Sequence, residues 1–180
     1  ALGVDPGDKD VMKERPREPK ESFFARGAGA KAAIGGILIG TLTLLAFYFG
    51  LTGRGYVFGA GNPTEAQLMY ARTMAFVVLA TSQLFYSLSI RNSTKSILQV
   101  GLFTNMKLIG AIVVGFILQA IVISIPALAS AFKVHNLPLN DWGIVIGFAL
   151  IPLIVNEIIK IFMRVSEKKK KQTDNIEIID

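Results

Sequence analysis

Apolar residues of this chain gather in four stretches that contain almost no charge. They cover residues 32–51, 73–90, 108–132 and 142–155, and each is bounded by lysine, arginine or turn-forming residues. A helix needs about 20 apolar residues to cross a hydrocarbon core of roughly 30 Å. The pattern therefore predicts an all-α membrane protein with four transmembrane helices.

The second stretch is too short to span a bilayer by itself. Thr64 and Gln67 precede it with the spacing of a capping box, in which both side chains bond to backbone donors at a helix start. We therefore expect a helix that begins near Glu65 and continues through the second stretch.

Proline and glycine modify the other predicted spans. The fourth stretch reaches full length only with residues 156–163, and Pro126 and Pro152 should kink the third and fourth helices. The spacing of Gly36 and Gly40 is the small-residue pattern that favours close helix packing.

Lysine and arginine are unevenly distributed among the segments that join the stretches. They are frequent in residues 1–31, in the loop 91–107 and after residue 159, and sparse in the other two loops. Cytoplasmic segments of membrane proteins carry an excess of these residues. We predict that both ends and the loop 91–107 are cytoplasmic, and that the net charge of +6 reflects topology and not nucleic-acid binding.

The composition agrees with a membrane class and limits the chemistry. Hydrophobic residues make up 52% of the 180 positions, which leaves too little polar surface for a soluble domain. The chain has no Cys, so a thiolate metal site is excluded. Its one His, His135, falls in a short loop, and we identify no certain metal ligand.

Polar residues inside the spans are where function would appear. Gln83 and Ser87 lie one helical turn apart, with Tyr86 beside them. Two interpretations of Gln83 stay open, an interhelical hydrogen bond and a ligand of a transported ion. Gln119, alone in the third stretch, is expected to form an interhelical hydrogen bond.

The last span ends with an acid and a base on one helix face. Glu157 and Lys160 are three positions apart, so their side chains can pair. We expect them to anchor the helix at the membrane interface, with the lysine extended towards water.

A family resemblance accompanies these patterns. The first segment resembles the cytoplasmic loop after the sixth membrane helix of type II P-type cation ATPases, most closely reticulum-type calcium pumps, and reads ALGVDPGDKDVMKERPREPKE. The resemblance continues at residues 33–36, is strongest at 71–75 with ARTMA, and extends to Trp142 and Glu157. It implies that the four spans correspond to the family's seventh to tenth helices.

The resemblance implies the C-terminal membrane domain of a P-type calcium pump. Its partners would be the lipid bilayer and the remainder of the pump, where ATP and Mg²⁺ bind and where the first six membrane helices lie. The sequence contains no Asp-Lys-Thr-Gly phosphorylation motif, so we expect no catalytic residue in this chain. Residues 1–31 would form a coupling loop, 32–163 the four-helix domain, and 164–180 a basic tail.

The resemblance also suggests roles for single residues. Asp8, Asp10 and Arg17 match the acidic pair and the basic end of the loop that docks on the phosphorylation domain. Gln83 takes the place of a Glu in the reticulum pumps, whereas plasma-membrane pumps, which move one Ca²⁺ per cycle, carry Gln there. The resemblance thus implies a cation pathway at Gln83 and export of one Ca²⁺ per cycle.

Two alternatives to a calcium pump remain. The chain could belong to a pump for Na⁺, K⁺ or Mn²⁺, or it could be a free-standing four-helix membrane assembly protein. The start at Ala1 and the coupling loop favour the interpretation that this chain is part of a larger pump. The short tail, without a regulatory segment, suggests a bacterial plasma membrane.

Overall fold

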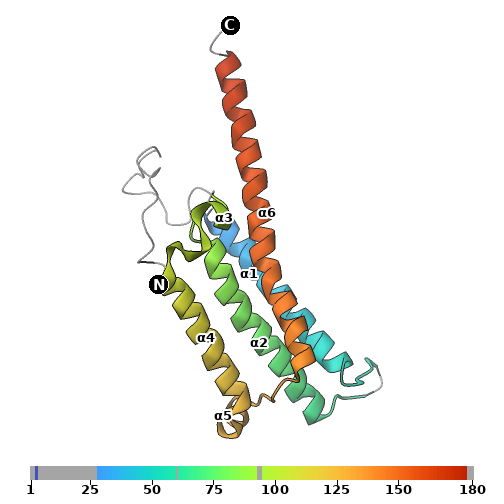
Figure 1. Ribbon diagram of the computed structural model, residues 1–180. Coiled ribbons are helices and arrows are strands. Elements are labelled where there is room, and N and C mark those ends of the chain that lie inside the picture. The colour runs from blue at the N-terminus through green and yellow to red at the C-terminus, as the bar shows by residue number, and fades with distance from the viewer. Residues whose placement is uncertain (1–2, 4–27, 60, 93–94, 178–180) are drawn as a thin grey trace.

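The protein is a bundle of helices (Figure 1). The computed structural model describes residues 3, 28–59, 61–92 and 95–177. Its helices are α1 (Ala28–Thr52), α2 (Glu65–Ser89), α3 (Ile97–Val100), η3 (Leu102–Thr104), α4 (Met106–Ser124), α5 (Pro126–Phe132) and α6 (Leu139–Glu177), and the described residues contain no strand. Four of these helices, α1, α2, α4 and α6, are long and apolar enough to cross a membrane. The predicted fold class is confirmed.

Helix α2 lies at the centre of the bundle, with α4 on one side and α1 and α6 on the other (Figure 1). Its Val77 and Val78 are fully buried in the core, together with Ala46 of α1 and Val145 of α6. By contrast, α4 keeps half of its apolar side chains exposed and buries only Leu108 and Ile123 among them. The position of α2 is therefore set by its packing against three neighbouring helices.

Helices α1 and α2 approach each other closely at Gly50. A Cβ added there would lie 2.7 Å from the Cα of Ala71, so no larger residue fits without a backbone shift. Gly36 and Gly40, by contrast, face no described atom within 4 Å of such a Cβ. The small-residue contact between these two helices is therefore made at a different glycine from the ones that the spacing pattern indicated.

The start of α2 agrees with the capping prediction. The backbone N–H of Thr64 donates to Oε1 of Gln67 at 2.9 Å, and the N–H of Gln67 donates to Oγ1 of Thr64 at 3.3 Å. The helix begins at Glu65 and has 25 residues, which gives the second span its full length.

The two prolines act differently from each other. Pro126 breaks the third predicted helix instead of kinking it, because a proline ring disfavours helical geometry at the preceding residue. Ile125 is accordingly extended, with φ −84° and ψ 117°, and Pro126 begins the separate helix α5. Pro152 is buried inside α6, which continues past residue 163 to Glu177.

Candidate functional site

Gln119 joins α4 to α2. Its side-chain N–H donates to the carbonyl oxygen of Val77 at 3.0 Å, and its Oε1 accepts from the hydroxyl of Thr81 at 3.1 Å. Both Gln119 and Thr81 are buried. The expected interhelical hydrogen bond is confirmed, and it fixes α4 to the centre of the bundle.

A larger polar cluster joins the end of α2 to α6. We call it the Glu157 cluster, and it consists of Ser89, Ser96, Asn156, Glu157 and Lys160. The Oε1 atom of Glu157 accepts from the Ser89 hydroxyl at 2.5 Å and from Lys160 Nζ at 2.8 Å. Its Oε2 atom accepts from the Ser96 hydroxyl at 2.7 Å and from the backbone N–H of Ile97 at 3.0 Å. One carboxylate thus receives four hydrogen bonds.

Lys160 is the cation of this cluster, and only 3% of the residue is exposed. Besides Glu157, its Nζ donates to the carbonyl oxygen of Ser89 at 2.5 Å and to that of Lys95 at 3.2 Å. The three protons of an ammonium group therefore all have acceptors. The predicted ion pair is confirmed, but the expected extension of Lys160 towards water is wrong, because the loop after α2 folds over the ammonium group.

The cluster also fixes the short helix α3. Ser96 caps α3 in a second capping box with Gln99, and Glu157 accepts from the first backbone N–H of that helix. Arg164 of α6 extends the contact by donating to Oε1 of Gln99 at 2.7 Å. Sequence reasoning did not identify Ser96, although its spacing to Gln99 is the same capping signal that located the start of α2.

Gln83 has a different environment from Gln119. Its side chain is exposed, and it makes no hydrogen bond within the part of the chain that the structure describes. One turn away, the Ser87 hydroxyl donates to the carbonyl oxygen of Leu84 in its own helix at 2.6 Å. Gln83 therefore forms no interhelical hydrogen bond between the four described spans.

The remaining predicted site residues are not described by the structure. Asp8, Asp10 and Arg17 all lie outside the described residues. Among the described residues, no group of three or more His, Cys, Asp or Glu side chains is placed to hold a metal ion.

The family model for the C-terminus of cation-transporting ATPases matches residues 1–162. The chain belongs to this ATPase family. It is 48% identical over 89% of its length to calcium-transporting ATPase 1 of Bacillus cereus, and 39% identical over 84% to the calcium-transporting ATPase of Bacillus subtilis. It is 32% identical over 95% to calcium-transporting ATPase type 2C member 1 of Mus musculus.

The chain spans less than a fifth of the length of these relatives, with shares of 19%, 16% and 17%. The family match includes the segment with Asp8, Asp10 and Arg17, as well as Gln83 and the Glu157 cluster. The structure of this C-terminal region therefore has two candidate functional features. One is the exposed amide of Gln83 on α2, and the other is the buried ion pair of Glu157 and Lys160 that holds the end of α2.

Proposed function

We propose that this chain is the C-terminal membrane domain of an ATP-driven P-type calcium pump that exports Ca²⁺. The observation that carries the proposal is the match to proteins named calcium-transporting ATPases over more than four-fifths of the chain. Four helices of spanning length support it. The chain itself contributes helices to the pump, while ATP and Mg²⁺ bind elsewhere in the protein.

Gln83 is the residue that we assign to the cation pathway. A polar side chain without a partner is costly in hydrocarbon, so the exposed amide is expected to face another polar part of the pump. Its carbonyl oxygen suits Ca²⁺, which prefers oxygen ligands. A neutral amide supplies no charge to offset the loss of the ion's water, so we propose that the pump moves one Ca²⁺ per cycle.

The Glu157 cluster supports this role by fixing α2. The carboxylate and Lys160 connect the last turn of α2 and the following loop to α6 through hydrogen bonds from 2.5 to 3.2 Å. A helix fixed at one end holds its side chains in a defined direction. We therefore propose that the cluster positions α2, and with it Gln83, against the remaining helices of the pump.

Coupling to ATP is assigned to the segment before α1. Asp8, Asp10 and Arg17 are proposed to dock on the phosphorylation domain and to pass its movement to the helices. The charge distribution supports a cytoplasmic position for this segment, the loop 91–107 and the C-terminal end. The similarity to proteins of Bacillus supports a bacterial plasma membrane as the location.

Transport by the full-length protein in reconstituted vesicles tests the proposal. We expect ATP-dependent uptake of one Ca²⁺ per ATP, and a weaker apparent Ca²⁺ affinity for Gln83→Leu. Ser87→Ala is the matched control, because in the described part of the chain that hydroxyl bonds to its own helix, so its loss should leave the affinity unchanged.

Three outcomes contradict parts of the proposal. Two Ca²⁺ per ATP rules out a single site. ATP turnover that depends on Na⁺, K⁺ or Mn²⁺ and not on Ca²⁺ identifies a pump for another cation. The absence of any ATP-dependent transport favours the assembly protein.

A further inference from the structure

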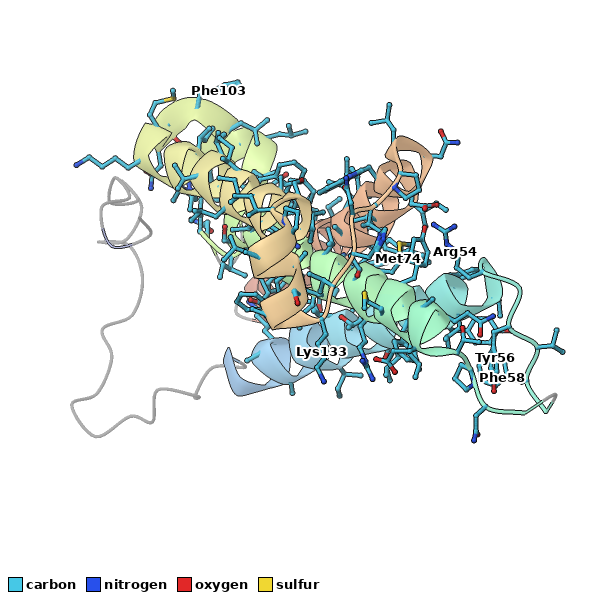
Figure 2. All side chains as sticks on the ribbon, turned by 90° about the horizontal axis from the view of Figure 1, so that it is seen from below. Arg54, Tyr56, Phe58, Met74, Phe103 and Lys133 are labelled. Carbon is cyan, nitrogen blue, oxygen red and sulfur yellow. The ribbon has the colours of Figure 1, made fainter. Side chains whose placement is uncertain are left out.

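A pocket opens where α1 ends and where α2 and α6 begin. Its volume is about 490 Å³, within the range of pockets that hold small molecules. Phe49, Met74 and Ile144 give it an apolar side, and Arg54 and Asp141 give it charged groups. In Figure 2, Arg54 and Met74, which both line the pocket, lie close together. Phe49 and Ile144 are about half exposed, so the apolar side is open to the surroundings of the helices.

Arg54, which carries the positive charge of this pocket, is held in place by hydrogen bonds of its backbone and by an aromatic ring. The N–H of Arg54 donates to the carbonyl oxygen of Leu51 at 3.1 Å, and the carbonyl oxygen of Arg54 accepts from Nε2 of Gln67 at 3.1 Å. The guanidinium carbon lies 3.9 Å from the centre of the Tyr70 ring. Stacking on an aromatic face leaves the edge donors of a guanidinium group available to a ligand.

The negative charge of the pocket comes from a different element, helix α6. Asp141 lies in the first turn of α6 and is half-buried, and its N–H donates to the carbonyl oxygen of Pro138 at 3.0 Å. The loop before it is fixed to α2, because the N–H of His135 donates to Oγ1 of Thr73 at 2.8 Å. The pocket walls are therefore fixed by hydrogen bonds on both sides.

The two charged side chains do not satisfy each other. Within the described part of the chain, neither the guanidinium of Arg54 nor the carboxylate of Asp141 takes part in a hydrogen bond or an ion pair. The pocket thus presents one available cation and one available anion beside an apolar wall. A ligand that matches this arrangement carries a negative group, a positive group with N–H donors, and an apolar portion.

We infer that the pocket binds a phospholipid of the phosphatidylethanolamine class. Arg54 donates to the phosphate oxygens, for which the planar guanidinium is suited, and Asp141 accepts from the primary ammonium. An acyl chain lies along Phe49, Met74 and Ile144. The location agrees with this ligand, since the ends of spanning helices lie at the level of the headgroups. The inference is independent of the transported ion.

Chemically related ligands match the pocket less well. The quaternary ammonium of phosphatidylcholine has no N–H to donate to Asp141, and phosphatidylglycerol has no cation at all. A soluble phosphate ester leaves the apolar wall uncovered. The structure therefore favours the ethanolamine headgroup on a lipid over each of these.

Native mass spectrometry of the full-length protein in detergent tests this inference. The three lipids, with equal acyl chains, are added at the same concentration, and we expect phosphatidylethanolamine to be retained most. Arg54→Gln should weaken its binding about fivefold, the equivalent of one headgroup charge contact. Asp141→Asn should lower the preference for phosphatidylethanolamine over phosphatidylcholine by about the same factor.

Arg72→Gln is the matched control. Arg72 pairs with Glu65 at 3.3 Å and does not line the pocket, so lipid retention should be unchanged. Equal retention of the three lipids by the unaltered protein overturns the inference, and so does equal retention by the Arg54→Gln and Arg72→Gln variants. Displacement of the lipid by O-phosphoethanolamine overturns it too, because it would identify a site for a soluble ester. If Arg54→Gln does not fold, an unchanged lipid preference in Asp141→Asn is the result that contradicts it.

Discussion

Removal of the carboxylate of the Glu157 cluster is expected to destabilise the protein strongly. Glu157→Ala leaves Lys160, whose side chain is only 4% exposed, without its counter-charge. The substitution also removes the hydrogen-bond acceptor of Ser89, Ser96 and Ile97. Breaking a buried ion pair from one side typically costs about 3–5 kcal/mol. Because 15% of the Glu157 side chain is exposed, we expect a value near the lower end, about 3 kcal/mol. That loss is about a hundredfold in the ratio of folded to unfolded protein.

The double variant Glu157→Ala with Lys160→Met separates the ion pair from the hydrogen bonds. It removes both charges, so no buried ammonium remains unpaired, but the donors of Ser89, Ser96 and Ile97 still lack their acceptor. We expect a loss of about 1–2 kcal/mol, smaller than that of Glu157→Ala alone. The two substitutions should therefore be strongly non-additive.

Unfolding of the full-length protein in mixed micelles, followed as the denaturing detergent is raised, measures these differences. Glu65→Ala is the control. The side chains of Glu65 and Arg72 are 68% and 43% exposed, so the ion pair between them should contribute no more than about 1 kcal/mol to stability. If the losses from Glu157→Ala and Lys160→Met simply add in the double variant, the two side chains do not stabilise each other and the interpretation of the cluster is wrong.

Two further predictions concern the packing and the orientation of the helices. Gly50→Ala places a Cβ 2.7 Å from the backbone of Ala71 and should lower stability by about 1–3 kcal/mol in the same unfolding assay. Gly110→Ala is the control, because its Cβ meets no described atom within 4 Å and stability should not fall. Equal effects of the two substitutions would contradict the close contact of α1 and α2. Cysteines introduced singly into this Cys-free chain at Gly61 and Asn136 should react with an impermeant reagent added outside intact cells, and a cysteine at Thr173 should not. The reverse labelling pattern would show that the orientation predicted from charge is wrong.

The sequence by itself determined the number of spans and where α2 begins. Both follow from local rules, since hydropathy over about 20 residues sets a span and the Thr64 and Gln67 side chains satisfy backbone donors within one turn. The same local rule, applied to Ser96 and Gln99, would also have located α3. The pairing of Glu157 with Lys160 was equally accessible, because residues three apart on a helix are neighbours.

The tertiary structure decided which face of each helix is covered. Ile37 and Leu42 of α1 are similar apolar residues in one span, yet they are 72% and 5% exposed. Lipid is as apolar as a leucine side chain, so hydropathy carries little information on how a membrane helix is rotated. For this reason the sequence left the role of Gln83, which has no partner among the described spans, open, although it predicted that Gln119 would form an interhelical hydrogen bond. Only the packing of α1, α2 and α6 brought Arg54 and Asp141 to one pocket and placed the loop after α2 over Lys160.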